Sequence, residues 1–258
     1  MAKLRTRREG RHLIVTLADA GRQNALSAQM VAEFDAALDA LPEALGALVI
    51  EGEGGVFSAG ADLKALGAAL ATPPGDDDPL AALNAAGGRF FARIYALRCV
   101  TIALVDGAAV GGGMGLAAAA DIVIATPRAR FALTETSLGF PPAQIAPYLV
   151  ARLGARVATR LALTGARIDG REAAALGLAD FYSETDGADR LAQVLDAVAR
   201  CAPGANAATK LLLRAVAAPD YIDKAAQAFA AALRGREGRE GLAAFAQKRA
   251  PRWTGAEV

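Results

Sequence analysis

The chain has 258 residues, of which 54% are hydrophobic and 21% charged, and its formal net charge is +1. This length can build one large hydrophobic core, while the apolar, nearly neutral composition excludes a disordered chain and argues against a nucleic-acid-binding surface. The two cysteines, Cys99 and Cys201, lie far apart, so a disulfide framework is not expected and a reducing cytoplasm fits.

The first hundred residues alternate between strand-like and helical patterns. Apolar runs at 12–18 and 47–54 indicate strands, and the first run is too short for an export signal. Helical patterns cover 27–41 and 81–97, with Ser27 as the expected N-cap of the first helix. This alternation predicts parallel strands joined by helices.

Three further segments complete the organisation of the chain. The acidic, proline-containing stretch 71–80 is expected to be an exposed loop. The long apolar run 99–125 raises the question of a membrane span, but its glycines and Asp106 favour a buried strand, a tight helix and a second strand. The pattern becomes wholly helical near the C-terminus, which predicts a core domain at 1–187 and a helical region at 188–258.

The residue types present limit which kinds of catalytic or binding site the chain can form. His12 is the only histidine, so a histidine-based catalytic triad and a zinc site are both disfavoured, and no metal is expected. The glycine cluster "GGGMG" at 111–115 fits neither phosphate-binding glycine motif. Glycine at a strand-to-helix junction suits either a close-packed helix start or an oxyanion hole. A second small-residue turn at 54–66, again between a strand and a helix, favours the oxyanion hole.

Three motifs together resemble the enoyl-CoA hydratase/isomerase family, also called the crotonase family. They are "FSAGADLK", "GGGMGLAAAADIVIA" and "FALTETSLGF", and the similarity extends from "RQNALS" to "EGLAAFAQKR". The resemblance implies an α/β crotonase fold, similar to ClpP: a spiral of strand-strand-helix units with a C-terminal helical region that forms trimers, sometimes paired as hexamers. It also implies a coenzyme A thioester substrate, with no separate cofactor.

The same resemblance assigns site residues by motif position. The thioester oxygen would be held by the backbone N–H groups of Ala61 and Gly112, and Glu135 would be the proton carrier. Residues expected to contact the substrate or its coenzyme A portion are Arg22, Ala59, Ala61, Asp62, Leu63, Gly112, Gly115 and Gln144. The common hydratases carry a second glutamate where this chain has Gly115.

A single glutamate leaves several functions open. The segment "GFPPAQIAPYLVARLG" resembles hydratases of branched glutaconyl-CoA thioesters, methylglutaconyl-CoA and isohexenylglutaconyl-CoA, which favours a hydratase. Gln144 is a candidate helper for the water, or a turn residue, and Tyr148 is expected to pack in the core. The alternatives are a double-bond isomerase that uses Glu135 as sole base, and a catalytically inactive acyl-CoA-binding relative.

Overall fold

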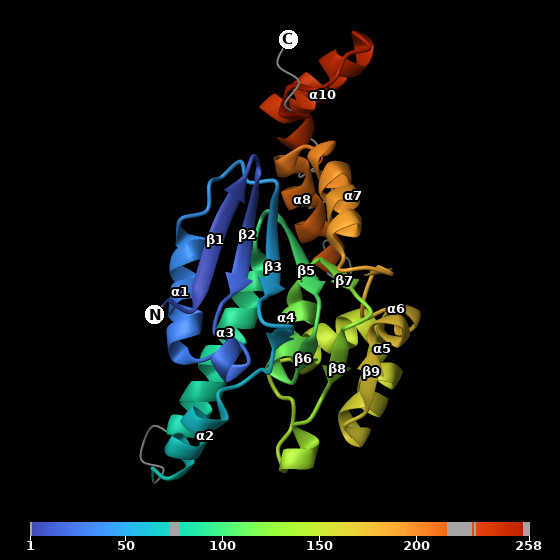
Figure 1. Ribbon diagram of the computed structural model, residues 1–258. Helices are drawn as coiled ribbons and strands as arrows, with labels where there is room; N and C mark the ends of the chain where they lie inside the picture. Colours follow the sequence, from blue (N-terminus) through green and yellow to red (C-terminus); the bar gives the residue numbers. More distant parts are fainter. Residues whose placement is uncertain (1, 73–77, 216–228, 230, 255–258) are drawn as a thin grey trace.

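The computed structural model describes residues 2–72, 78–215, 229 and 231–254. A six-stranded sheet runs through the protein in the order β1-β2-β3-β5-β7-β10 (Figure 1). β1 and β2 form an antiparallel hairpin, and the other neighbours are parallel. The strands are β1 (Leu4–Glu9), β2 (His12–Leu17), β3 (Ala47–Gly52), β5 (Val100–Val105), β7 (Ile122–Ala125) and β10 (Phe181–Tyr182).

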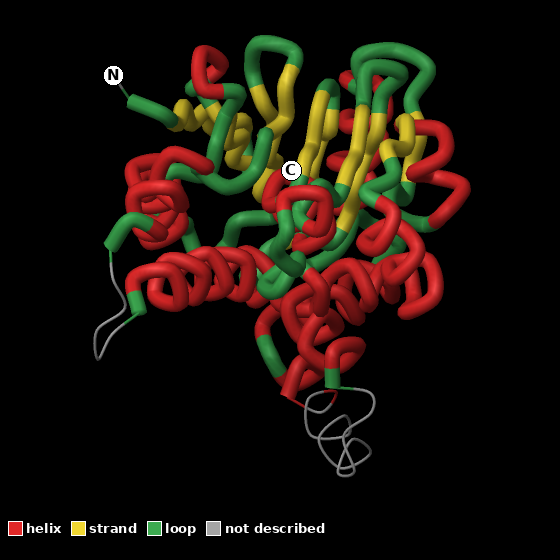
Figure 2. The backbone as a smooth tube through the Cα atoms, turned by 90° about the horizontal axis from the view of Figure 1, so that it is seen from below, coloured by secondary structure: helices red, strands yellow, loops and turns green. Residues whose placement is uncertain are grey.

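Helices cover both faces of this sheet, although Figure 2 shows most of them on one side of the strands. Alternate residues of a strand face opposite sides, so Leu48 and Ile50 of β3 belong to the larger hydrophobic cluster, while Val49 packs in a smaller one with Val198. The helices are α1 (Ala28–Asp39), α2 (Leu63–Leu70), α3 (Pro79–Ala96), α4 (Gly112–Ala119), α5 (Ala146–Thr164), α6 (Gly170–Leu176), α7 (Ala188–Ala199), α8 (Pro203–Arg214) and α10 (Arg236–Ala246), with 3-10 turns η1 (Ala20–Arg22), η2 (Thr136–Leu138) and η3 (Arg252–Thr254).

A second sheet of four short strands positions the functional region. Its strands, in spatial order, are β4 (Val56–Ser58), β6 (Ala108–Val110), β8 (Arg130–Ala132) and β9 (Arg167–Asp169), and the first three are parallel. The pairs β3–β4, β5–β6 and β7–β8 are each consecutive in the chain, with one strand in each sheet. The chain therefore winds as a spiral, and the carboxyl ends of β4, β6 and β8 meet at one edge.

Most of the predicted elements are confirmed. The Ser27 hydroxyl accepts from the Met30 N–H at 3.3 Å and caps α1, as expected. The expected loop 71–80 is shorter than predicted, because the Asp78 carboxylate accepts from the Leu80 N–H at 2.9 Å and starts α3 at Pro79. Residues 73–77 of that loop lie outside the described residues, as does most of 220–235, a part of the predicted helical C-terminal region.

The C-terminal helices dock on the sheet through a charged cluster. Asp121, which follows α4, accepts from Thr101 and pairs with Lys210 and Arg214 of α8 at 2.5 and 3.0 Å. α7 begins at Ala188, and the division of the chain into 1–187 and 188–258 stays a prediction. None of the helices in the described parts of the chain has the length and apolar character needed to span a bilayer.

Candidate active site

Three turns at the shared edge of the second sheet form the candidate site. They follow β4, β6 and β8, and contain Ala59–Asp62, Gly111–Gly112 and Thr134–Glu135 respectively. The Gly111 N–H donates to the Ala132 carbonyl at 2.8 Å, which ties the second turn to the third. Residues far apart in the sequence are thus brought together because their strands are parallel neighbours.

Buried polar groups hold the first turn. Asn24 is fully buried, and its side-chain amide donates to the carbonyls of Glu53 and Val56 at 3.0 and 2.7 Å. Its backbone is in the left-handed region, with φ +52°, as is that of the preceding Gln23, with φ +54°. The Ser58 hydroxyl donates to the Asn24 carbonyl at 2.8 Å and accepts from the Gly60 N–H at 3.1 Å. Sequence reasoning missed this role of Asn24, although the residue stands in the quoted motif "RQNALS".

Glycines let the backbones of the first two turns approach closely. A Cβ on Gly60 would lie 2.5 Å from the Val110 carbonyl oxygen, and one on Gly113 would lie 2.1 Å from the Ser58 carbonyl oxygen. Both distances are far below van der Waals contact, and Gly60 also has φ +83°, which disfavours any side chain. Glycine at positions 60 and 113 is therefore required by backbone packing.

The two predicted donors lie side by side in this arrangement. A Cβ on Gly112 would be 3.5 Å from the Ala61 nitrogen. Gly112 is the first residue of α4, where N–H groups have no intrahelical acceptor, and Ala61 N–H has no backbone acceptor among the described residues. Paired backbone donors at a helix N-terminus suit a carbonyl oxygen that gains negative charge.

Glu135 approaches these donors from the third turn. A Cβ on Gly111, where φ is +52°, would lie 2.9 Å from the Glu135 Oε1 atom, so the carboxyl rests against the start of α4. Its Oε2 atom is buried and has no hydrogen-bond partner within the described structure. Burial raises the pKa of Glu135, and the backbone N–H groups of Glu135 and Thr134 oppose the shift. A raised carboxyl pKa is what proton transfer near neutral pH needs.

The residues expected to contact coenzyme A gather at the first turn, but two of them have structural partners. The Arg22 guanidinium pairs with the Asp62 carboxylate at 2.8 Å. Asp62 also caps α2 by accepting from the N–H groups of Lys64 and Ala65 at 3.1 and 3.4 Å. Leu63 is exposed, and Ala59 donates its N–H to the Gln23 carbonyl at 2.9 Å.

The remaining expected residues line the adjoining helices. The Gln144 amide nitrogen donates to the Asn84 side-chain oxygen at 2.8 Å. Gly115 is buried in α4, and a Cβ there would lie 2.1 Å from the Ile145 Cγ2 atom. Tyr148 packs against the core beside Phe91 and Tyr95, with a ring-centroid distance of 5.3 Å to Tyr95, which confirms its predicted role.

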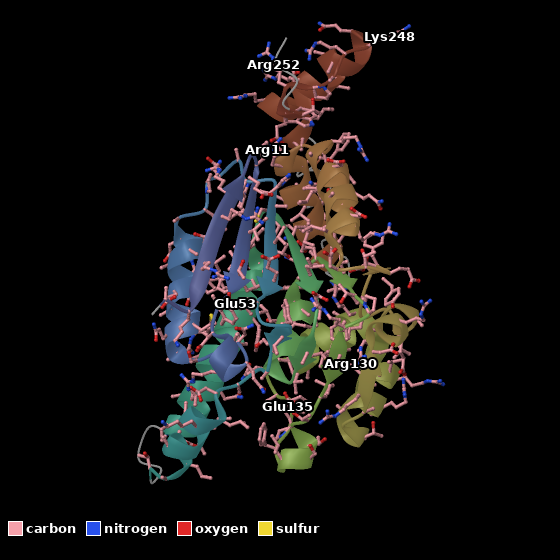
Figure 3. All side chains as sticks on the ribbon, in the orientation of Figure 1. Arg11, Glu53, Arg130, Glu135, Lys248 and Arg252 are labelled. Carbon is pink, nitrogen blue, oxygen red and sulfur yellow. The ribbon has the colours of Figure 1, made fainter. Side chains whose placement is uncertain are left out.

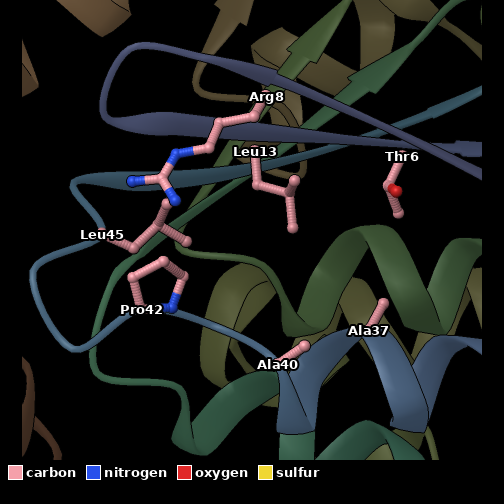
Figure 4. A pocket seen from close by; sticks show the side chains of 7 residues that line it. All are labelled: Thr6, Arg8, Leu13, Ala37, Ala40, Pro42 and Leu45. Carbon is pink, nitrogen blue, oxygen red and sulfur yellow. The ribbon is translucent and has the colours of Figure 1, made fainter.

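A separate concavity has no connection with these turns. A pocket of about 160 Å³ lies between the β1–β2 hairpin and α1 (Figure 4), and its lining residues include none from the three site turns. Glu135 lies at the end of the molecule opposite Lys248 and Arg252 of the C-terminal region (Figure 3). Across the described ranges, no three His, Cys, Asp or Glu side chains group so that they could hold a metal ion.

The fold and these turns define an α/β protein that sets paired backbone donors beside a half-buried carboxyl, one oxygen of which has no hydrogen-bond partner in the described structure. Comparison with known proteins then places it in a family. The chain belongs to the enoyl-CoA hydratase/isomerase family, whose model matches residues 9–256. The crotonase-type spiral predicted from the motifs is confirmed.

Individual relatives cover nearly the whole chain. It is 32% identical to the 2,3-dehydroadipyl-CoA hydratase of Escherichia coli strain K12, over 99% of this chain and all of that protein. The crystal structure of an enoyl-CoA hydratase/isomerase from Marinobacter aquaeolei has a TM-score of 0.93 at 42% identity, over 98% of this chain and all of that one. Pseudomonas aeruginosa AtuE has a TM-score of 0.92 at 44% identity, over 98% of this chain and 99% of that one.

Proposed function

We propose that the protein is an enoyl-CoA hydratase that adds water across the α,β double bond of a branched, glutaconyl-type acyl-CoA thioester. The observation that supports this most directly is the Glu135 carboxyl, which lies against Gly111 next to the Gly112 and Ala61 donors. A proposed proton carrier and the proposed oxyanion donors thereby meet at the start of α4. Coenzyme A enters as part of the substrate, and the reaction proposed needs no further cofactor.

The chemistry follows from these three groups. The Glu135 carboxylate takes a proton from water as the water oxygen bonds to the β carbon. The electron pair of the double bond moves towards the thioester oxygen, and the N–H groups of Ala61 and Gly112 stabilise the resulting enolate. Glu135 then returns the proton to the α carbon as the carbonyl re-forms. One carboxyl group suffices for both transfers, and no atom is left over.

The branched acyl group is supported by sequence similarity. The segment from Gly139 to Gly154 resembles hydratases of methylglutaconyl-CoA and isohexenylglutaconyl-CoA, which also lack a glutamate at the position of Gly115. A relative at 32% identity over 99% of this chain is named 2,3-dehydroadipyl-CoA hydratase, which supports a hydratase.

The contacts with coenzyme A and the assembly are part of the proposal. We propose that the first turn, with Arg22, Ala59, Asp62 and Leu63, contacts the coenzyme's nucleotide portion, and that Gln144 helps to hold the water. We also propose a trimer, or a pair of trimers, because apolar side chains on the C-terminal helices are exposed. Leu211, Leu213 and Leu242 are 59%, 68% and 58% exposed.

A double-bond isomerase is the second candidate function. It is favoured by the glycine at position 115, where the common hydratases have a second glutamate. An isomerase moves one proton between two carbons and needs one base, which Glu135 provides. A catalytically inactive acyl-CoA-binding relative would keep the fold and bind the thioester without turnover.

A screen of enoyl-CoA thioesters distinguishes the three candidate functions, which are hydratase, isomerase and inactive acyl-CoA-binding protein. The substrates are straight-chain, branched and carboxylated, and the readouts are loss of the conjugated double bond and product mass. A hydratase adds the mass of one water; an isomerase shifts the bond at unchanged mass; a binder shows ligand-dependent thermal stabilisation without product. The proposal fails if no substrate gains water.

A further inference from the structure

The side chains of Gln144 and Ile145, which are consecutive in the chain, each pack directly against a glycine in a helix. A Cβ on Gly88 of α3 would lie 2.2 Å from the Gln144 Oε1 atom, and a Cβ on Gly115 of α4 would lie 2.1 Å from the Ile145 Cγ2 atom. Both side chains therefore occupy space that any other residue at 88 or 115 would need. The segment that precedes α5 is inserted between α3 and α4 by these two contacts.

The contact at position 115 is rigid, whereas the one at position 88 is not. The atom that would meet a Cβ on Gly88 is near the end of the flexible Gln144 side chain. At Gly115 the Ile145 Cβ atom itself would be 2.8 Å away, so a change of side-chain rotamer cannot make room. Ile145 is 4% exposed, and its neighbour Gln144 is bound to Asn84. Nothing larger than glycine fits at 115 while Ile145 is present.

Ile145 and the proposed proton carrier, Glu135, lie against neighbouring positions at the start of α4. The Gly115 N–H donates to the carbonyl of the N-cap residue Gly111 at 3.0 Å, so position 115 lies one turn further along, a rise of about 6 Å. The Glu135 carboxyl rests against Gly111, and Ile145 rests against Gly115. The Glu135 carboxyl and the Ile145 side chain thus lie against two positions that are one turn apart at the start of α4.

We propose that Ile145 is a specificity-determining residue: by filling the space beside Gly115, it keeps a second proton-carrying side chain out of the position next to Glu135. The inference rests on the proposed hydratase function. If Ile145 has this role, the site uses a single carboxyl group, and the space beside Gly115 is filled by an apolar side chain. A change at position 115 alone cannot convert the site to a two-carboxyl one, whereas a paired change at 115 and 145 can.

A thermal unfolding cycle tests the packing, independently of any reaction. The variants are Gly115→Ala, Ile145→Gly and their combination, with Gly87→Ala of α3 as the matched control, because a Cβ on Gly87 meets nothing within 4 Å. Gly87→Ala is expected to keep or raise Tm. Gly115→Ala is expected to lower it, and the double variant to be more stable than the sum of the two single effects. Gly115→Ala as stable as Gly87→Ala would overturn the proposal.

A turnover measurement tests the consequence for specificity. Ile145→Gly and Gly115→Glu/Ile145→Gly are compared on crotonyl-CoA, a straight-chain thioester. The added carboxyl is expected to raise turnover on the order of 10²-fold, the lower end of what a positioned acid or base contributes. Equal turnover of the two folded variants would show that Ile145 is a packing residue only. The wild type could hydrate no thioester while the thermal cycle shows that the changes at 115 and 145 are not additive. The proposed hydratase function would then be wrong, and so would the specificity role of Ile145. Only the packing of Ile145 against Gly115 would be established.

Discussion

Replacing Glu135 by glutamine separates its chemistry from its place in the fold. Glutamine keeps the shape of the side chain but cannot carry the proton. A positioned acid or base contributes ~10²- to 10⁴-fold, which corresponds to ~2.7–5.4 kcal/mol of barrier, so kcat should fall by at least ~10². The backbone donors Ala61 and Gly112 are untouched, so binding of the thioester should change little. Glu184→Gln, a change in an exposed pair with Arg171, is the control.

Burial of the Glu135 carboxyl also predicts a pH effect on stability. The folded pKa is raised above the ordinary value of 4.5, so folding favours the protonated form. That contribution is complete below the ordinary pKa and is lost as pH rises through the raised one. Above the raised pKa, Glu135→Gln should therefore unfold at a higher Tm than the wild type, with the difference disappearing at acid pH.

Steady-state kinetics and thermal unfolding across pH check both effects. In the proposed hydration the ionised carboxyl takes the first proton, so wild-type kcat/KM should decline as pH falls below the raised pKa of Glu135, and the glutamine variant should lack this limb. A variant that folds and keeps wild-type turnover with the same acid limb would refute the assignment, and another proton carrier would have to be sought.

Three further predictions concern the donor, the docking cluster and the assembly. Gly112→Pro removes one backbone donor at the first residue of α4, where proline is tolerated, so kcat should fall ~10²- to 10³-fold in a folded protein; near wild-type turnover would contradict the oxyanion assignment. Asp121→Asn leaves the half-buried Lys210 ammonium without its anion and should lower the free energy of unfolding in urea by ~1.5–3 kcal/mol. The exposed Glu184→Gln change should lower the free energy of unfolding by under ~1 kcal/mol. If the Asp121 and Glu184 variants lose equal stability, the docking role of the Asp121 cluster is refuted. Light scattering at micromolar concentration should give a trimer or hexamer, and a stable monomer would contradict the proposed assembly.

Long periodic elements and motif positions could be predicted from the sequence. Helix α1 follows from its apolar spacing and the Ser27 cap, and β5 from a continuous apolar run. Glu135 and the glycine cluster were assigned from motif position, and the structure brings them together. These features are local, or belong to short contiguous motifs, so one segment at a time is enough to predict them.

The second sheet and the contact of Ile145 with Gly115 could not be predicted in this way. Strands β4, β6, β8 and β9 have only three residues each, too few to show a period of two. A glycine reveals that space is needed, but the identity of the occupying atom, here the Ile145 Cγ2, depends on a segment thirty residues later in the chain. Such pairings are set by tertiary packing, and a lone glycine is equally compatible with a turn or a helix start.

Helix α4 explains why a stretch without polar side chains can be central to a reaction. Its residues are only glycine, methionine, leucine and alanine, so it acts through backbone groups and must be positioned by its neighbours. The Arg152 guanidinium donates to the Ala118 and Ala120 carbonyls at 3.1 and 2.6 Å, and thereby satisfies the C-terminal end of the helix. Asp121, immediately beyond, binds the cations of α8. The polar groups that hold α4 are therefore concentrated at its C-terminal end, which leaves the N-terminal N–H groups free of side chains and close to Glu135.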